Sequence, residues 1–388
     1  MNISELFIHI PEYRQRGMCR YSLSEVLTIS LFAVLSGAND SVEIEAYGKK
    51  KLAFLQTVLP CLTRIPSHDT IERTFQHIDI SAFKSVLLTC SKLLFFYEGD
   101  YLLNIDGKVL RGTSRRRCKD GKKARKNDGI CILTAWASEQ RVVLGQQKIA
   151  AKTNEKTAIP QLIRGMDIQD AIVTIDAVLC TPVLSELIVG KGGNYILAVK
   201  GGNKHLLNQL TTCFDTSTTQ VFECDKQTDY VGGRIEQRTC TITQQLELLD
   251  KTHPYKNCQT VLKIESVREY NKGTALSKET ETRYYISNLD RNAKEFNGFV
   301  RGHWGIENNL HWALDMVFQE DACRVIKGNA PENLNTLRKI ALEILTAFPD
   351  KDSLKVRRKN AGWDDQFAYD LIHNFLNKEE NQFVKKSS

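Results

Sequence analysis

Two aspartates occupy matching positions in this sequence, each at the end of an apolar run and each followed by a small residue. Asp106 ends the run Leu-Leu-Asn-Ile-Asp before Gly107, and Asp176 ends Ile-Val-Thr-Ile-Asp before Ala177. A carboxylate at the end of a single strand is commonly a turn or capping residue. Two of them on neighbouring strands of one sheet could instead share a divalent cation, with the small residues leaving room for a phosphate.

A third acid, Glu307, lies in the segment 301–315, where polar residues recur every four positions. These residues are His303, Glu307, His311 and Asp315. In a helix this spacing places all four along one face, which is usually the solvated side. Trp304 and Trp312 flank the stripe, which favours a half-buried groove. Their indoles could pack in the core or stack on a flipped base, and we expect core packing.

Carboxylates in this pattern are typical of phosphoryl transfer. Three of them supply enough negative charge to hold two Mg²⁺ or Mn²⁺ ions, which prefer oxygen ligands. Two such ions about 4 Å apart activate the attacking oxygen and stabilise the leaving oxygen of an in-line displacement. A zinc site built from His303 and His311 is the alternative, and the hard carboxylates beside them argue against it.

A dense basic segment begins just after Asp106. Between Lys108 and Lys126 there are ten basic residues and one acid, Asp120, in a chain whose net charge is +7. A charge run is usually a solvated face, but one this dense inside a folded region favours a phosphate-rich partner. We expect phosphate contacts from seven of its residues, Lys108, Arg111, Arg115, Arg116, Arg117, Lys122 and Lys123. A second basic cluster at 355–359 could extend that surface.

The composition narrows the class of protein. Apolar residues make up 42% and charged residues 26% of 388 residues, which is ordinary for a globular chain of two or three domains. The most apolar segment, 27–38, is interrupted by two serines and is shorter than the roughly 20 residues of a membrane span. Without a signal sequence or a C-x-x-C pair among eleven cysteines, we expect a cytoplasmic protein with reduced thiols and no membrane contact.

The first 97 residues have helical periodicity. Helices are expected from Ser22 or Ser24 to Gly37, over 42–59, and from Ser67 to His77, where Asp69 and Glu72 have capping-box spacing. The last of these could be a DNA-recognition helix, and an ordinary helical bundle fits the pattern equally well.

From residue 99 onwards the pattern changes to alternating strands and helices. The expected order is strands 101–110, 130–138 and 141–149, helix 155–165, strand 171–175, helix 182–189 and strand 195–199. This order predicts a mixed sheet covered by helices. A β-rich insertion follows, with a helix at 204–213 and strands around 238–243, 260–269 and 280–286. A long helix over 294–318 then carries Glu307, and a further helix covers 331–345.

The segments around the three acids resemble those of the DDE transposases called H-repeat-associated proteins. The resemblance lies in Asn-Ile-Asp-Gly-Lys-Val-Leu-Arg-Gly-Thr at 104–113, Thr-Ile-Asp-Ala at 174–177 and His-Trp-Gly-Ile-Glu-Asn-Asn-Leu-His-Trp-Ala-Leu-Asp at 303–315. It continues to Arg324 and covers nearly the whole chain.

This resemblance implies an α/β fold, an RNase H-like mixed sheet flanked by helices, with a β-rich insertion and an N-terminal helical domain. The implied divisions are 1–97 for the helical domain, 98–200 and 289–348 for the catalytic core, 201–288 for the insertion and 349–388 for a C-terminal helix and tail. Asp106, Asp176 and Glu307 become the catalytic, metal-binding triad for two Mg²⁺ or Mn²⁺ ions.

The resemblance also implies what the site acts on. Transposases of this kind hydrolyse double-stranded DNA at the ends of an insertion sequence, and the freed 3′ hydroxyl then attacks target DNA. A homodimer on DNA, associated with the bacterial nucleoid, would pair two such ends. Related transposases carry Arg four residues before the Glu and Lys seven after it, whereas this chain has His303 and Leu314.

The departure leaves several roles open. His303 and His311 become candidate DNA contacts, Asn308 and Asp315 candidate supports of the metal ligands, and Asp315 and Asp321 rivals for the third ligand. Two other functions fit the same residues: a non-catalytic DNA-binding descendant, and an RNase H-like nuclease that cleaves without joining. An α/β metabolic enzyme is disfavoured, because the chain has no glycine-rich phosphate loop or nucleotide fingerprint.

Overall fold

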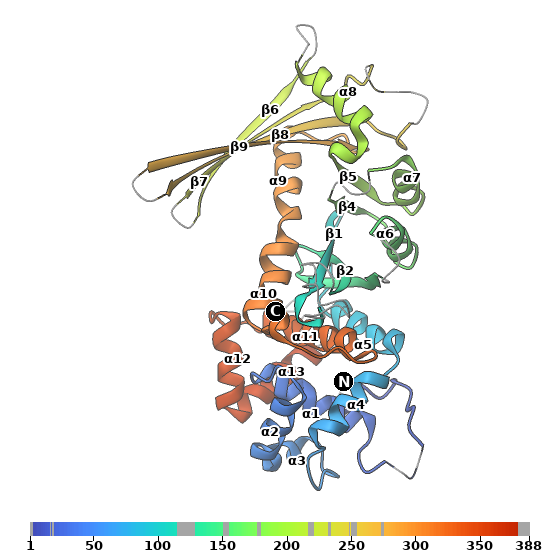
Figure 1. Cartoon of the computed structure of the whole chain (residues 1–388), viewed down its shortest axis with the longest axis vertical. Coiled ribbons are helices and arrows are strands. Elements are labelled where there is room, and N and C mark those ends of the chain that lie inside the picture. Colours follow the sequence, from blue (N-terminus) through green and yellow to red (C-terminus); the bar gives the residue numbers. More distant parts are fainter. Residues whose placement is uncertain are drawn as a thin grey trace, which may run out of the picture.

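The chain forms a helical part at one end and a long mixed sheet at the other, joined by one long helical segment (Figure 1). The structure is a computed structural model that describes residues 3–15, 17, 19–114, 129–149, 155–176, 180–215, 221–231, 234–247, 249, 254–272 and 275–378. The α/β class and the mixed sheet predicted from the sequence are confirmed.

Five helices of the N-terminal part pack together: α1 (Leu23–Leu35), α2 (Ser41–Lys50), α3 (Leu52–Val58), α4 (His68–His77) and α5 (Ile80–Lys92). Ser22 and Glu25 form the capping box of α1. The prediction of a single helix over 42–59 is wrong, because the helix is interrupted at Lys51, between α2 and α3. The capping prediction for α4 is also wrong, since Ser67 is the N-cap and accepts from the Thr70 amide.

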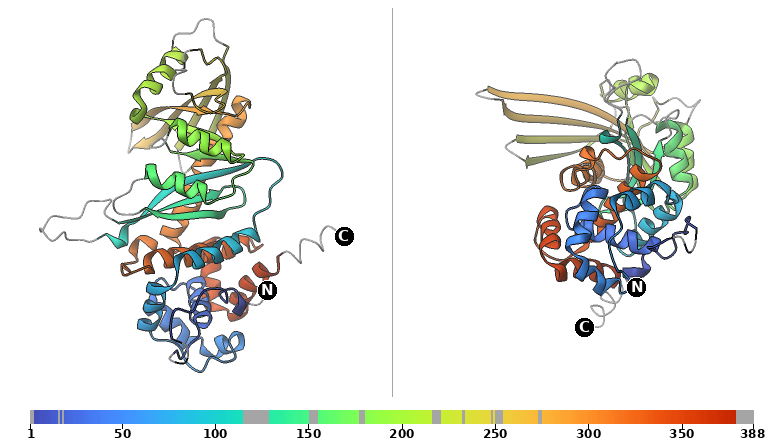
Figure 2. Two further views of the ribbon diagram at one scale, coloured as in Figure 1. Left: turned by 90° about the vertical axis from the view of Figure 1, so that its right-hand side faces the viewer. Right: turned by 60° about the horizontal axis from the view of Figure 1, so that its bottom comes forward.

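Three C-terminal helices complete the same core: α11 (Ala330–Ala347), α12 (Leu354–Trp363) and α13 (Asp365–Leu376). One cluster of buried apolar side chains joins them to α1–α5, so the two ends of the chain fold as one unit, as both views of Figure 2 show. The basic cluster predicted at 355–359 as a DNA surface is wrong for two of its members. Arg357 and Arg358 are buried and donate to backbone carbonyls.

The nine described strands form one sheet in the order β3-β2-β1-β4-β5-β9-β8-β7-β6. Its first half contains β1 (Tyr101–Leu110), β2 (Ile130–Ala137), β3 (Val142–Ile149), β4 (Ala171–Ile175) and β5 (Asn194–Val199). As predicted, β1, β2 and β3 are consecutive antiparallel strands, whereas β4 and β5 run parallel to β1.

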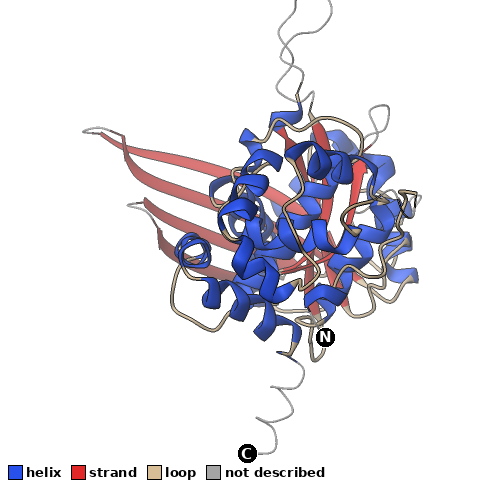
Figure 3. Cartoon of the chain, turned by 90° about the horizontal axis from the view of Figure 1, so that it is seen from below, coloured by secondary structure: helices blue, strands red, loops and turns tan. Residues whose placement is uncertain are grey.

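The β-rich insertion extends this sheet instead of forming a separate one. Its strands are β6 (Glu223–Val231), β7 (Arg234–Thr243), β8 (Thr260–Lys272) and β9 (Ala275–Ser287), all antiparallel. The end of β9 pairs with β5, and the outer parts of the four strands project beyond the helices (Figure 3). The sequence did not predict β6, because its polar and acidic residues lack an apolar alternation.

Helices cover both faces of the core sheet. On one face lie α6 (Glu155–Arg164), α7 (Pro182–Gly190) and α8 (Lys204–Asp215), over a cluster that includes Leu103 and Ile105 of β1. On the other lies α9 (Ala293–His303), over a cluster that includes Leu102 of β1 and Ile172 of β4. Successive strand residues alternate between faces, so even-numbered residues of β1 and β4 point towards α9.

Helix α11 attaches the helical part to the sheet through buried polar groups. The Lys339 ammonium donates to Thr134 Oγ1 at 2.8 Å and Gln146 Oε1 at 2.7 Å, on β2 and β3. One turn later, the Glu343 carboxylate accepts from the Val143 amide at 2.9 Å and the Ser91 hydroxyl at 2.9 Å. Burial lowers the pKa of Lys339 to about 7 and raises the pKa of Glu343 to about 8.

No helix in the described ranges is long and apolar enough to cross a membrane. The ten cysteines within those ranges are all free thiols.

Candidate active site

Asp106 lies on β1 and Asp176 directly follows the neighbouring parallel strand β4, which is one of the two arrangements that the sequence left open. The register between β1 and β4 pairs Asn104 with Thr174 and Ile105 with Ile175, so Asp106 and Asp176 follow at adjacent positions. Both aspartates have even numbers, like the residues of β1 and β4 whose side chains point towards α9. Their carboxylates therefore leave the sheet on the side covered by the helix that leads to Glu307.

A buried hydrogen-bond network fastens that helix to the two strands. The Asn104 amide of β1 donates to the Gly302 carbonyl of α9 at 2.8 Å and to Ser138 Oγ, and its oxygen accepts from the Thr174 hydroxyl at 2.7 Å. Gly302 lies directly on β1, because an added Cβ would come within 2.3 Å of Leu102 Cδ2. The network fixes the height at which Glu307 emerges above the two aspartates.

The long helix predicted over 294–318 contains a turn of different geometry. It runs as α9, a π-helical segment (Ile306–His311) and α10 (Trp312–Met316), and the Trp312 amide donates to the Glu307 carbonyl. π-Helical turns are rare and recur at functional sites. Ile306 and Leu310 point into the core while Glu307 and Asn308 are exposed, so the wide turn presents the Glu307 carboxylate outwards.

All three acids line one small pocket of about 60 Å³, together with two cations. Lys200 follows β5, and its ammonium lies 2.7 Å from Asp176 Oδ1 and 3.1 Å from Oδ2. Arg283 of β9 stacks over the Trp304 ring at 4.6 Å and bonds Glu281 Oε1 at 2.8 Å. The pocket therefore combines acids from β1, β4 and the π-helix with bases from β5 and β9.

His303 lines the same pocket and is held neutral. Burial lowers its pKa to about 4. Its Nδ1 lies 2.9 Å from Thr174 Oγ1, and that hydroxyl already gives its proton to Asn104. The imidazole must therefore donate from Nδ1, which leaves Nε2 as an acceptor at neutral pH.

His311 stands beside Asp106, with Nδ1 3.6 Å from Oδ2. Burial, together with the charges of Lys339 and Lys108, lowers the pKa of His311 to about 3. The ring is uncharged at neutral pH, so this contact is not an ion pair there. His303 and His311 thus border the acids as neutral polar groups and not as cations.

The three acids of the pocket offer the oxygen ligands that a hard divalent cation prefers, although their carboxylates lie apart. Among the described residues, no three His, Cys, Asp or Glu side chains are gathered closely enough to hold a metal as they stand. Although the Glu307 side chain is exposed in part, its partial burial at the pocket raises its pKa, and the negative charge of Asp176 raises it further. Like-charged oxygens facing one pocket are stabilised by a bound cation, and carboxylate oxygens are the ligands that Mg²⁺ and Mn²⁺ prefer.

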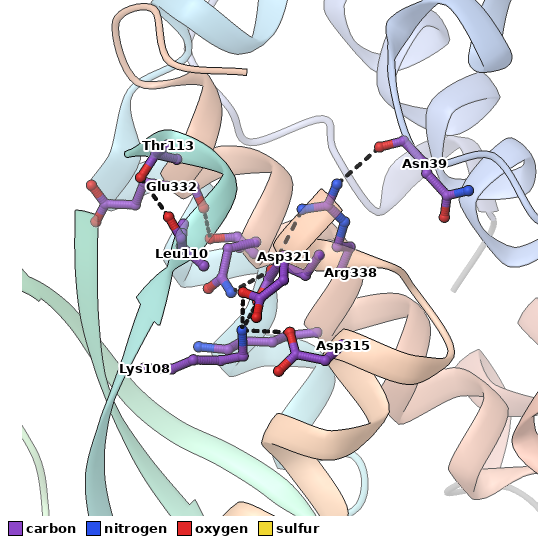
Figure 4. A network of polar contacts seen from close by, with 12 residues as sticks. Asn39, Lys108, Leu110, Thr113, Asp315, Asp321, Glu332 and Arg338 are labelled. Carbon is purple, nitrogen blue, oxygen red and sulfur yellow. Dashed lines mark hydrogen bonds and ion pairs between the residues drawn. The ribbon is translucent and has the colours of Figure 1, made fainter. Parts of the chain in front are cut away.

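Lys108, which the sequence assigned to phosphate binding, is buried in a network of acids (Figure 4). Its ammonium lies 2.7 Å from Asp315 Oδ1 and 3.3 Å from oxygens of Glu320 and Asp321. Burial alone would lower the pKa of Lys108, but the surrounding carboxylates, Glu320 first, raise it. Asp315 and Asp321, the rival third ligands, are thus engaged by this lysine.

Arg338 of α11 completes the network. Its guanidinium lies 3.4 Å from Glu320 Oε1 and donates to the Asn39 carbonyl at 2.9 Å. Glu320 is fully buried; burial favours a raised pKa, but Arg338 and Lys108 outweigh it and lower the pKa. The network therefore ties β1 to α10, α11 and the N-terminal helices.

The other predicted DNA contacts are placed differently. Arg111 is exposed and lies 3.4 Å from Asp321 through Nε. Asn308 is exposed beside Glu307. Arg115, Arg116, Arg117, Lys122 and Lys123 lie outside the described residues. The prediction that Trp312 packs in the core is wrong, since 55% of it is exposed, whereas Trp304 is half-buried under Arg283.

The sequence analysis missed Lys200 and Arg283. Lys200 ends the apolar run Tyr-Ile-Leu-Ala-Val-Lys, and this is the same signal that singled out the two aspartates. Arg283 had no comparable signal, because the pairing of β9 with β5 that brings it to the pocket joins residues far apart in the chain.

Comparison with known proteins shows which family this chain belongs to. The family model described as "Transposase DDE domain" matches residues 97–344, which include all three acids, and the model "DDE_Tnp_1-associated" matches residues 4–90. The chain belongs to the DDE transposase family. The two matches divide near the boundary between the N-terminal helices and β1.

Relatives of this transposase family member extend over nearly its full length. "Putative transposase YncI" of Escherichia coli O157:H7 is 33% identical over 94% of this chain and 92% of its own. "H repeat-associated putative transposase YhhI" of Escherichia coli K12 is 33% identical over 89% of this chain and 91% of its own. A shorter relative, "Inactive transposase YbfQ", is 38% identical over 19% of this chain.

Proposed function

We propose that this protein is an active DNA transposase that cleaves the ends of an insertion sequence and joins them to target DNA. The observation that carries the proposal is that Asp106, Asp176 and Glu307, from three separate elements, line one pocket. Membership of the DDE family supports a nucleic acid as the substrate.

The three acids would hold two divalent cations, Mg²⁺ or Mn²⁺. When bound, such ions supply charge stabilisation to the attacking and leaving oxygens of an in-line displacement at phosphorus. The protein's own contribution is placement: Asn104, Thr174 and Gly302 hold the Glu307 helix over the two aspartates. Lys200 and Arg283, the two bases that line the same pocket, would supply positive charge to substrate phosphates.

The proposal includes the surroundings in which this chemistry occurs. The partner is double-stranded DNA, both element ends and target, in the cytoplasm of a bacterial cell and on its nucleoid. A homodimer would bring two ends together for joining. The basic segment 111–126, which begins with the exposed Arg111, would bind the DNA flanking the scissile bond.

Nicking of supercoiled plasmid tests the proposal. Wild-type protein with Mg²⁺, Mn²⁺ or EDTA is compared with Glu307→Gln and Asp176→Asn. We expect metal-dependent nicking in the wild type and none in either variant. Exposed acids outside the pocket provide matched controls, Glu186→Gln on α7 and Asp215→Asn on α8.

Two results would contradict the proposal in different ways. Equal nicking by Glu307→Gln and wild type would remove the site assignment. Salt-dependent DNA binding without nicking, on DNA that carries the element's own ends, would favour the non-catalytic descendant. Strand-transfer products, sought with a 3′-labelled end duplex, separate a transposase from a nuclease that only cleaves.

A further inference from the structure

Lys200 is the cation in closest contact with an acid of the pocket. Both oxygens of Asp176 accept from its ammonium, at 2.7 and 3.1 Å. The alternation that turns Ile196 and Ala198 of β5 towards α9 continues to Lys200, so the side chain leaves the sheet on the same side as the aspartates. Its contact with Asp176 therefore follows from the pairing and alternation of the strands.

The second cation of the pocket is held in a different way. The Arg283 guanidinium is stacked on Trp304 and bonded to Glu281, outside the set of three acids. Lys200 therefore lies on the acid that the proposed metal would need, whereas Arg283 does not. A divalent cation on the oxygens of Asp176 would repel an ammonium at this distance, so the two cations compete for the carboxylate.

We propose that Lys200 is an exchangeable counter-ion: it neutralises Asp176 in the metal-free protein and, when a divalent cation takes that carboxylate, turns to bind a phosphate of the scissile DNA strand. This inference rests on the proposed function. It makes Lys200 a positioning residue that links metal binding to DNA binding. Metal would then create a phosphate contact that the metal-free protein lacks.

The surroundings of Lys200 leave room for this movement. Half of the Lys200 side chain and half of the Asp176 side chain are exposed. Gly201 and Gly202 follow, and a Cβ added at either position would meet nothing within 4 Å. A lysine is a compact charge on a flexible four-carbon stem, so it can leave one anion for another without moving the backbone.

The first test measures metal binding without DNA. Free Mn²⁺ is followed by electron paramagnetic resonance as the ion is titrated into the full-length protein, wild type or Lys200→Met. We expect Lys200→Met to bind Mn²⁺ about two- to fivefold more tightly, the size expected when one half-exposed ion pair is lost. Lys191→Met is the matched control, because Lys191 precedes the opposite end of β5 and donates to the Arg164 carbonyl.

A double-variant comparison separates exchange at Asp176 from a general effect of charge. In an Asp176→Asn background, Lys200→Met should no longer change Mn²⁺ affinity, since the carboxylate for which the two cations compete is gone. If Lys200→Met tightens Mn²⁺ binding equally in both backgrounds, the lysine acts only through long-range charge and the proposed exchange is overturned.

The second test measures binding of a short fluorescent duplex in EDTA and in Ca²⁺, with the duplex checked for integrity on a gel. In EDTA we expect wild type and Lys200→Met to bind equally, because the lysine is occupied by Asp176. In Ca²⁺, Lys200→Met should bind the duplex about three- to tenfold more weakly than wild type. The slope of its affinity against salt concentration should also decrease by the amount expected for about one phosphate contact. Equal affinities in Ca²⁺ would overturn the inference.

These results also distinguish this inference from the proposed function. If wild type binds Mn²⁺, Asp176→Asn binds it measurably more weakly, and Lys200→Met equals wild type in both tests, only the role of Lys200 fails. If wild type shows no Mn²⁺ binding that depends on Asp176, the metal site and the exchange fail together.

Discussion

The candidate active-site pocket and the interface under α11 both place ionisable side chains in partly or wholly buried surroundings, but they balance the charges of these side chains differently. Under α11, Lys339 and Glu343 each have two short hydrogen bonds to the sheet or to α5, and Lys108 is surrounded by three carboxylates. In the pocket, three acids share two cations, and the pKa of Glu307 is still raised by burial and by the negative charge of Asp176. Satisfied polar groups hold the two parts of the molecule together, whereas the pocket keeps an excess of acids over cations and can take a further cation from outside.

The largest effect is expected at Asp106, where the comparison predicts a large loss of activity with little change in stability. Asp106→Asn should lower metal-dependent nicking by more than about 100-fold, beyond the range of residues that only support a metal ligand. Thermal unfolding should stay near wild type or rise slightly, because the substitution removes repulsion among the acids. Nicking and melting temperature are measured on the same preparation. A variant that nicks like wild type would contradict the site.

The reverse pattern is expected at Lys108. Lys108→Met leaves three carboxylates without their shared cation, and one of them, the Glu320 carboxylate, is fully buried. The substitution should therefore lower the free energy of unfolding by about 3–5 kcal/mol. Urea unfolding measures it, with the exposed Lys204→Met as control. If Lys108→Met unfolds at the wild-type urea concentration but binds DNA weakly, Lys108 contacts phosphate after all and the network is not its role.

Glu343 should make stability depend on pH. Its pKa is raised from 4.5 to about 8, so the folded state holds a proton that the unfolded chain releases above pH 4.5. The stability it contributes is present below pH 4.5 and is lost as the pH rises towards 8, on the order of 5 kcal/mol. Glu343→Gln keeps a neutral group and should flatten this part of the profile. Urea midpoints across that pH range measure it, and an unchanged slope would show that the carboxyl is ionised.

The smallest effect is expected at Trp312. Because 55% of this side chain is exposed, Trp312→Ala should cost less than about 1 kcal/mol. The buried Trp136 on β2 provides the contrast, and Trp136→Ala should cost about 3–5 kcal/mol. Equal losses in the two variants would mean that Trp312 is covered, for example by a second copy of the chain.

Local patterns in the sequence were sufficient for the strands that carry the acids. The bounds of β1 and β4 follow from apolar runs that end in turn residues, and the helix bearing Glu307 follows from its four-residue repeat. These elements are defined by neighbours in the chain, so their position could be read from the sequence alone.

Contacts between distant segments decided the rest. Lys108 looked like part of a solvated basic run, and only the packing of β1 against α10 and η6 (Glu320–Ala322) buries it among acids. Arg358 gave no signal of burial, because its partners are backbone carbonyls of 34, 38 and 317. The π-helical turn was hidden for another reason: a repeat of four residues is compatible with an α-helix throughout.

That wide turn is equivalent to an α-helix that has gained one residue. Each residue of an α-helix rotates the next by about 100°, and the wide turn takes up its extra residue locally, so the helix on either side keeps its phase. Removing one residue from Ile306–His311 would therefore restore regular geometry and leave Asp315 beside Lys108, while the bulge that presents Glu307 over the pocket would be lost. A single-codon deletion in this turn thus separates two requirements that the present length meets together: a carboxylate over the pocket and an anchor for the helix beyond it.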